Sequence, residues 1–394
     1  MNILTTGLGW NDQQPGGLNR YFVDYHTALA SYGHSGQGFI IAERGNNLNT
    51  DLNITNTAAG LSQPHLISRM KSVRQHTLHA LHSFHADVFN PHFALYATLV
   101  SRKMIPAHIP IVTHFHGPWA LESKLEESQR HGAIRQSRYL IKKQIEQMNY
   151  RRSDRLIVLS EYFRGILTEQ YGIDQEKIKI IPGAVEHERF IPHPDREGLR
   201  RQLGIGPEQK LLFCARRIVR RMGIDRLIEA MRAVVNSDPN VRLMIAGDGP
   251  MRLEYERLIE DLELTEQVKL LGRVSNEELV QWYQAADMSI VPTITLEGFG
   301  LVTVESLACG TPVLGTPYGG TKEILQKFSE ALLFKDGTAE AMSDSILAVL
   351  NNRLMIPSRE QCREHVLRHY TWGRVIDSVT DVFQEEVEKR RIYR

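Results

Sequence analysis

The stretch TLEGFGLVTVESLACGTPVLGTP, residues 295–317, carries two carboxylates, Glu297 and Glu305, around the turn Gly298-Phe299-Gly300. After this turn LVTVESLACG has helical spacing and TPVLGT reads as a buried strand, so the stretch predicts a loop, a helix and a strand in succession. A helical rise of about 1.5 Å per residue would separate the carboxylates by roughly 10 Å, at or beyond the upper limit for the acid/base pair of a glycoside hydrolase. The spacing therefore favours two glutamates that serve two parts of one elongated ligand.

The same alternation of apolar, β-rich runs with helical segments extends along the whole chain. It is typical of parallel sheets covered by crossover helices, so the predicted class is α/β with two doubly wound, Rossmann-like halves. The runs predicted as strands are NILTTG, GFIIAE, ADVFNPHF, IPIVTHFHG, DRLIVLS and KIKIIPG in the first half, and LLFCARR, VRLMIAGDG, VKLLGRV, MSIVPT, TPVLGT and ALLF in the second.

The length of 394 residues favours two domains. Pro182 and Gly183 interrupt the pattern just after a strand, and a polar stretch follows. We therefore expect domains at 1–185 and 186–370, with a last helix in 371–394 that packs back on the first domain. Because open α/β sheets bind ligands at the carboxyl ends of their strands, we expect the ligand in the cleft between the two domains.

The composition argues against several classes of partner. A formal net charge of +1 indicates neither a nucleic-acid binder nor an acidic tail. No segment reaches the roughly 18 apolar residues of a membrane span, and the three cysteines are scattered singly. These features favour a cytoplasmic protein with reduced thiols.

Three motifs follow predicted strands. The pair Gly16-Gly17 in PGGLNR opens a helix, and either a phosphate-binding loop or a plain turn explains it equally well. GDGP, with Gly249, is a strand-end turn suited to a nucleotide. In THFHGPW, His114 and His116 lie on one side of their strand and Phe115 on the other, so either a ligand contact or a hydrogen-bonded pair is open.

Four histidines recur every third residue in HTLHALHSFH, from His76 to His85. Helical metal pairs usually use a spacing of four, and a three-residue step drifts round the helix by about 60°. No carboxylate or cysteine completes a coordination set, so the pattern favours a helix edge and we expect no metal.

The segment E297-G-F-G-x4-E305, followed by ACGTPVLGTPYGGTKEIL, resembles the E-x7-E signature of retaining, metal-independent GT-B glycosyltransferases of family 4. The resemblance covers most of the chain in the family's order, including the Gly-Gly loop, HFHG, VLSEYFRGIL, IPGAVEHERF, RRIVRRMGIDRLIEA, IAGDGP and LGRVS. It implies no cofactor, a nucleotide-sugar donor such as a UDP- or GDP-hexose on the second domain, and a hydroxyl acceptor on the first.

The resemblance also implies roles for single residues. Glu305 should hold the ribose, Glu297 a hydroxyl of the donor sugar, and His116 should contact the transferred sugar. Arg217 should pair with the pyrophosphate. The remaining donor-binding positions that it implies are Gly16, Gly17, Arg221, Gly249, Arg273, Val274, Gly298, Phe299, Gly300 and Leu301.

The chain departs from the family pattern at one position. Met222 stands where a lysine normally grips the donor phosphate, and Arg221 is the candidate substitute in a loop that also carries Arg216, Arg217 and Arg220. A nucleotide-sugar 2-epimerase, a sugar phosphorylase or an inactive sugar-binding protein remain alternatives to a transferase.

A basic stretch, residues 124–155, has apolar residues at helical spacing, among them Leu140, Ile141, Ile145 and Met148. Formal charge over 1–185 is 19 − 14 = +5, against 28 − 32 = −4 over 186–394. A basic amphipathic helix suits an anionic or lipid-linked acceptor at the inner face of a membrane, while a solvated helix that packs on its own sheet is the alternative.

Overall fold

The computed structural model describes residues 1–11, 16–42, 51–58, 65–126 and 132–392. The chain divides into two compact units. Unit 1 comprises Met1–Gly183 and Trp372–Arg394, and unit 2 comprises Ala184–Thr371. The boundaries expected from the sequence lie after residues 185 and 370.

Unit 1 is built on parallel strands. One sheet has the order β3-β2-β1-β4, a second has the order β5-β6-β7, and a parallel bridge between Phe89 and Ile111 connects β4 to the start of β5. The pairs within both sheets are all parallel. The strands are β1 (Asn2–Thr6), β2 (Ser35–Ile40), β3 (Ile54–Asn56), β4 (Val88–Pro91), β5 (Val112–Phe115), β6 (Arg155–Val158) and β7 (Ile178–Ile180).

The helices of unit 1 begin and end where the local sequence favours it. In α6 the hydroxyl of Ser160 accepts from the Phe163 N–H, and the helix ends at Gly172 with φ 63°, a left-handed cap. The helices are α1 (Gly17–Ser31), α2 (Leu66–Ser83), α3 (Ala94–Ala97), α4 (Trp119–Glu126), α5 (Gly132–Arg152), α6 (Glu161–Tyr171) and α15 (Trp372–Ile392), with short 3₁₀ turns η1 (Arg102–Met104) and η2 (Gln175–Lys177).

The last helix belongs to unit 1. Helix α15 contacts α1, and its Glu386 carboxylate accepts from the Arg155 Nε–H at 2.9 Å. The apolar side of α15 is buried and includes Trp372, Val379 and Phe383. This arrangement explains why the chain returns to unit 1 after it has completed unit 2.

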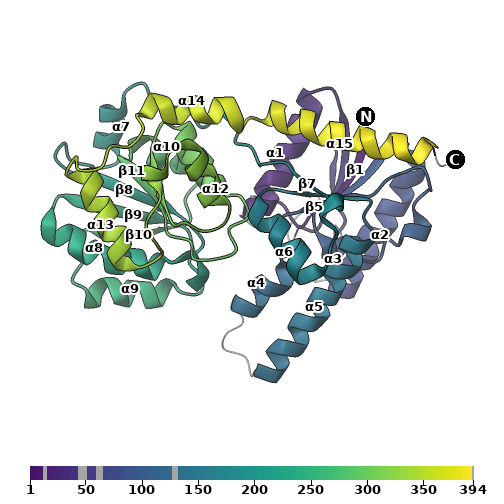
Figure 1. Ribbon diagram of the computed structural model, residues 1–394, viewed down its shortest axis with the longest axis horizontal. Coiled ribbons are helices and arrows are strands. Elements are labelled where there is room, and N and C mark those ends of the chain that lie inside the picture. Colours follow the sequence, from purple (N-terminus) through teal and green to yellow (C-terminus); the bar gives the residue numbers. More distant parts are fainter. Residues whose placement is uncertain (12–15, 43–50, 59–64, 127–131, 393–394) are drawn as a thin grey trace. The chain divides into compact units, whose positions relative to one another are not determined.

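Unit 2 is a five-stranded parallel sheet with the order β10-β9-β8-β11-β12. Figure 1 shows α8, α9 and α13 on one side of this sheet and α10 and α12 on the other. The strands are β8 (Lys210–Ala215), β9 (Val241–Ala246), β10 (Val268–Gly272), β11 (Met288–Val291) and β12 (Val313–Gly315). The helices are α7 (Arg196–Gln202), α8 (Ile224–Ser237), α9 (Arg252–Asp261), α10 (Asn276–Ala285), α11 (Leu301–Ala308), α12 (Gly319–Phe328), α13 (Ala339–Leu350) and α14 (Arg359–His369), with η3 (Arg220–Met222) and η4 (Glu330–Leu332).

The predicted α/β class with doubly wound parallel sheets is confirmed, but two details of the prediction are wrong. ALLF, residues 331–334, is not a strand: Glu330–Leu332 forms η4, and Leu333 makes only an isolated bridge to Gly315. A short strand, β3, lies in the stretch 48–66, to which no element was assigned. Its three residues are too few for a periodic signal.

A buried carboxyl joins three helices in unit 1. Glu146 of α5 is 1% exposed. It accepts from the Ala120 N–H of α4 at 3.1 Å, from the Tyr150 hydroxyl at 3.1 Å and from the Tyr171 hydroxyl of α6 at 2.7 Å. Burial raises the pKa of Glu146 to about 7, although these hydrogen bonds oppose the rise.

Glu146 should therefore make stability depend on pH. Because the folded chain holds this proton more tightly than the unfolded chain, its stabilising contribution is complete below pH 4.5 and is lost as pH rises through about 7, by about 3 kcal/mol. Glu146→Gln should remove this loss. Urea unfolding at about pH 5 and about pH 8 measures it.

Buried histidines such as His26 have lowered pKa values and act with the opposite sign, so the comparison of wild type with variant isolates Glu146. The exposed Glu169→Gln is the matched control and should follow wild type. Parallel pH profiles for wild type and Glu146→Gln would contradict this account.

Candidate active site at the strand ends

In unit 2 the loops that follow β8, β9, β10 and β11 are bonded to one another. The Ile218 N–H donates to the Asp248 carbonyl at 3.0 Å, and the Gly247 N–H donates to the Gly272 carbonyl at 2.7 Å. The Ile294 N–H donates to the Arg221 carbonyl at 2.9 Å. The carboxyl edge of the sheet thus presents a connected set of loops, and most of the predicted donor-binding residues lie on it.

A buried ion pair lies at the ends of β8 and β11. Glu297 Oε2 is 2.5 Å from Arg216 Nη2 and accepts from the Thr293 hydroxyl at 3.2 Å. Both charged residues are at most 9% exposed. The Arg216 Nε–H is buried and has no hydrogen-bond acceptor among the described residues. A buried cation with an unused donor is suited to an anionic ligand.

The structure pairs Glu297 with Arg216 and not with its neighbour Arg217, the residue that the resemblance singles out for the pyrophosphate. Arg216 is buried, whereas Arg217 is exposed. Successive side chains at a strand end point to opposite sides, so only one of two adjacent arginines can enter the interior. The role expected of Arg217 remains a prediction, and Arg216 joins it as a candidate.

The turn Gly298-Phe299-Gly300 is held close to the backbone of α12. The Gly320 N–H donates to the Glu297 carbonyl at 2.8 Å. A Cβ added at Gly320 would lie 2.5 Å from Phe299 atoms, which no side chain permits. Gly300, with φ 91°, caps the N-terminus of α11, and Leu301 is the first residue of that helix.

The helix does not include Glu297. Because α11 begins at Leu301, and Leu296 and Gly300 have φ of 58° and 91°, a helical rise cannot be applied from Glu297 to Glu305. The expected separation of roughly 10 Å thus rests on a geometry that the loop does not have. Glu305 lies inside α11, is 1% exposed, and accepts from the Tyr283 hydroxyl at 3.3 Å.

Arg221 and Met222 lie beside the same loop. Arg221 Nη1 donates to the Leu296 carbonyl at 3.3 Å, so this guanidinium supports the strained turn before Glu297. Met222 is 7% exposed, and its sulfur lies 3.6 Å from the Thr293 hydroxyl. A buried thioether provides packing at this position, where it can offer only a weak acceptor to a ligand.

Three predicted residues lie at the ends of β9 and β10. A Cβ at Gly249 would lie 2.3 Å from the Ile218 carbonyl oxygen, so this glycine is required by the packing of the loops. Arg273 is exposed, with its Nε 3.7 Å from the Asp248 carboxylate, and Val274 is partly buried. The donor-binding role that the resemblance implies for these residues stays a prediction.

In unit 1, Gly16 precedes α1 and Gly17 is its first residue. Gly16 has an extended φ of 171°, and a Cβ added at either glycine would meet no atom of the described chain within 4 Å. Neither backbone conformation nor packing within the described chain therefore requires glycine. A phosphate-binding loop and a plain turn thus both remain open, and the role expected of these glycines stays a prediction.

His114, on β5, and His116, just after it, point to the same side, as expected, and belong to a cluster with Asn90 and His92, which were not predicted. His92, just after β4, bonds His116 through its Nδ1 at 3.0 Å and the Asn90 Oδ1 through its Nε2 at 2.9 Å. The Tyr21 ring meets His116 edge-on at 4.8 Å, while Phe115 packs on the other side against Phe163 at 4.9 Å. NPHF at the end of a predicted strand is the signal that could have identified Asn90 and His92.

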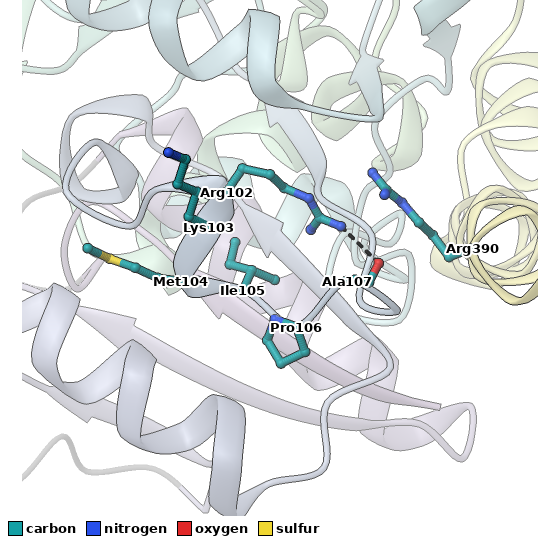
Figure 2. A pocket seen from close by; sticks show the side chains of 7 residues that line it. All are labelled: Arg102, Lys103, Met104, Ile105, Pro106, Ala107 and Arg390. Atoms are coloured by element: carbon teal, nitrogen blue, oxygen red, sulfur yellow. Dashed lines mark hydrogen bonds between the residues drawn. The ribbon is translucent and has the colours of Figure 1, made fainter. Parts of the chain in front are cut away.

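A cavity of about 530 Å³ lies elsewhere in unit 1. Its lining residues precede β5 in the chain except for Arg390 of α15. Figure 2 shows the Arg102 guanidinium directed at the Ala107 carbonyl, to which it donates at 3.0 Å. The lining residues are Arg102, Lys103, Met104, Ile105, Pro106, Ala107 and Arg390. None of the predicted site residues lines it.

Within residues 1–11, 16–42, 51–58, 65–126 and 132–392, no group of three or more His, Cys, Asp or Glu residues could hold a metal ion. His76, His79 and His82 lie along α2, and His85 follows it. Likewise, none of the helices in those ranges is both long enough and apolar enough to cross a membrane.

Comparison with known proteins assigns both halves of the chain. Residues 195–368 match the model for glycosyl transferases group 1, and residues 15–189 match the model for glycosyltransferase family 4. A GDP-mannose-dependent phosphatidylinositol monomannoside mannosyltransferase of Corynebacterium glutamicum is 27% identical over 59% of this chain and 62% of that protein. A D-inositol 3-phosphate glycosyltransferase of Geodermatophilus obscurus is 28% identical over 60% and 54%. The chain thus spans between about half and two thirds of the length of these relatives.

Solved structures share the fold. Sucrose-phosphate synthase from Thermosynechococcus elongatus superposes with a TM-score of 0.77 at 20% identity, over 98% of both chains. HepE from Anabaena, solved with UDP and glucose, gives 0.75 at 17% identity, over 97% of this chain and 99% of that one. These neighbours confirm the predicted GT-B fold class. With one family model on each half, this chain belongs to the group 1, family 4 glycosyltransferases.

Proposed function

We propose that the chain is a retaining, metal-independent glycosyltransferase that moves a hexosyl unit from a nucleotide-sugar to a hydroxyl acceptor. The observation that carries the proposal is the buried Arg216–Glu297 pair with its unused Arg216 Nε–H. One relative is named as GDP-mannose-dependent, and one structural neighbour was solved with UDP and glucose. Both names support a nucleoside diphosphate hexose as donor.

The departing diphosphate requires fixed positive charge close to its oxygens. The Arg216 guanidinium can supply it without a metal ion, and the N-terminus of α11 adds the positive end of a helix dipole. Retention means that the acceptor attacks on the face from which the diphosphate leaves, so that a phosphate oxygen can take the acceptor proton. On this proposal no carboxylate acts as a general base, and Glu297 and Glu305 are left to bind the sugar and the ribose.

A transfer assay with UDP- and GDP-hexoses and a panel of hydroxyl acceptors tests the reaction. Release of nucleoside diphosphate should require an acceptor, the anomeric configuration of the donor should persist in the product, and EDTA should leave the rate unchanged. NMR of the product determines the configuration. Acceptor-independent release would point to the epimerase instead, and an inverted product would refute retention.

The two adjacent arginines provide a second prediction. Arg216→Lys keeps a cation beside Glu297 but removes the unused Nε–H, so it should weaken binding of UDP or GDP about tenfold, because a charge-assisted hydrogen bond contributes about 1.5–3 kcal/mol. The exposed Arg217→Lys is the matched control and should change binding less. Calorimetric titration measures both, and thermal melting shows that both fold.

The opposite order of effects, with Arg217→Lys the more damaging, would restore the role that the family resemblance implies for Arg217. Equal and small effects would place the diphosphate away from both side chains and would remove the main support of the proposed function.

The acceptor side carries a candidate membrane contact over residues 124–155. On α5 the apolar side chains of Ile134, Ile141 and Met148 are 52%, 62% and 49% exposed and recur every seventh residue, which places them on one face. Basic residues of α5 include Arg135, Arg138, Lys142, Lys143 and Arg151. We propose that this face lies on an anionic lipid surface.

Replacing Ile141 with Glu should reduce co-sedimentation with phosphatidylglycerol vesicles at low salt several-fold, because it adds a charge to a face that must enter the lipid interface. Met355→Glu, on the 82% exposed Met355 of unit 2, is the control and should bind like wild type. If the wild-type protein does not co-sediment with anionic vesicles at low salt, this membrane contact is excluded.

A further inference from the structure

The hydrogen bonds around Asn90 in unit 1 fix the orientation of its amide. Asn90 Nδ2 lies 2.5 Å from the Val112 carbonyl oxygen and 2.9 Å from His114 Nδ1. A backbone carbonyl can only accept, so the NH₂ group must face Val112 and both of its hydrogens are used. The Asn90 Oδ1 is then the atom that faces His92 Nε2, at 2.9 Å.

This orientation determines where His92 carries its proton. An amide oxygen only accepts, so His92 Nε2 must carry the hydrogen. Burial lowers the pKa of His92 well below its usual value, and the neighbouring His114 and His116 lower it further, so the ring is neutral. A neutral imidazole with a hydrogen on Nε2 has a bare Nδ1, and that atom lies 3.0 Å from His116 Nε2.

His116 must therefore donate to His92. Its Nε2 carries the hydrogen, and because burial also lowers the pKa of His116, to about 3, the ring is neutral and its Nδ1 is bare. The two rings lie within 20° of parallel with centroids 5.2 Å apart, and the edge of Tyr21 at 4.8 Å limits rotation of His116. None of the hydrogen bonds found among the described residues uses His116 Nδ1, and the residue is partly exposed.

We propose that Asn90 and His92 are positioning residues that hold His116 with its hydrogen on Nε2 and its lone pair on Nδ1, so that His116 accepts a hydrogen bond from a ligand hydroxyl and does not donate one to a phosphate oxygen. The inference rests on the proposed function in one respect: the hydroxyl is that of the bound sugar. The proposal thereby specifies which ligand group His116 contacts. A phosphate oxygen without a proton can only accept, and an Nδ1 atom without a hydrogen cannot donate to it.

The same amide constrains His114. Its Nδ1 accepts from Asn90, so its hydrogen is on Nε2, a buried donor with no acceptor among the described residues. The Tyr25 ring lies 5.4 Å from His114, and its hydroxyl is likewise buried and without a partner in those residues. The orientation of the Asn90 amide thus places the ring hydrogen on Nε2 in His92, His114 and His116. This tautomer predicts the ¹⁵N signals of the three rings.

Long-range ¹H–¹⁵N spectra of the full chain with labelled histidine report which nitrogen of each ring carries the hydrogen, with the His116 signals assigned from His116→Gln. We expect an unprotonated Nδ1 and a protonated Nε2 for His116 at neutral pH. Inorganic pyrophosphate, a probe without a sugar hydroxyl, should leave Nδ1 unprotonated. Protonated Nδ1 in the wild-type chain, alone or with pyrophosphate, would overturn the proposal.

Substitutions at His92 separate positioning from packing. His92→Phe keeps a ring of similar shape without an acceptor, so His116 should divide between its two tautomers. His92→Gln can donate to Asn90 and accept from His116, so it should restore the wild-type signals. His26→Phe removes another buried ring, bonded to Thr5 at 2.7 Å, and should leave His116 unchanged.

Unchanged His116 signals in folded His92→Phe would refute the role of His92, and so would a loss of the wild-type tautomer in His26→Phe. If His92→Phe does not fold, the wild-type spectrum still tests the tautomer of His116, and the His92→Gln spectrum still tests whether a side chain that accepts from His116 maintains that tautomer. The spectra need neither donor nor acceptor, so the tautomer can be established in a chain that fails the transfer assay, and the two failures remain distinct.

Discussion

In a parallel sheet each strand must be joined to the next by a crossover, and crossovers of one hand place successive helices on one face. Where the strand order reverses, the chain changes face and adjacent carboxyl ends are left uncovered. In unit 1 this reversal falls between β1 and β4, and in unit 2 between β8 and β11. His92 follows β4, Arg216 follows β8, and Glu297 lies in the loop after β11. The positions of all three depend on this constraint.

Much of this arrangement could be predicted from the sequence because buried parallel strands are continuous apolar runs and strand ends carry polar motifs. What could not be predicted is local. Successive side chains at the end of β8 point to opposite sides, so only one of Arg216 and Arg217 faces the interior. The sequence carries no periodic signal that tells which of the two it is. ALLF is apolar because Leu332 is buried in a 3₁₀ turn. An apolar run of four residues has the same pattern in a buried 3₁₀ turn and in a buried strand, so the sequence cannot distinguish the two.

His92 and Asn90 were missed for a different reason. Their signal is chemical rather than periodic: the roles follow from the single amide of Asn90, whose orientation depends on Val112, a residue 22 positions away in the chain. Sequence patterns describe faces and periods, whereas a hydrogen-bond chain is defined by which atoms can donate. Such a chain is rigid only when nearly every member is satisfied, which is why burial makes it specific.

On the proposed function, each unit offers chemistry suited to a different part of a nucleotide-sugar: unit 2 to the diphosphate and unit 1 to the sugar. Arg216 in unit 2 has an unused N–H, and diphosphate oxygens can only accept. The proposed Nδ1 lone pair of His116 in unit 1 can only accept while the ring is neutral, and sugar hydroxyls can donate. On this proposal an Nδ1 atom that carries no hydrogen offers no donor to a phosphate oxygen, so the polarity of each unit selects the part of the donor that the unit binds.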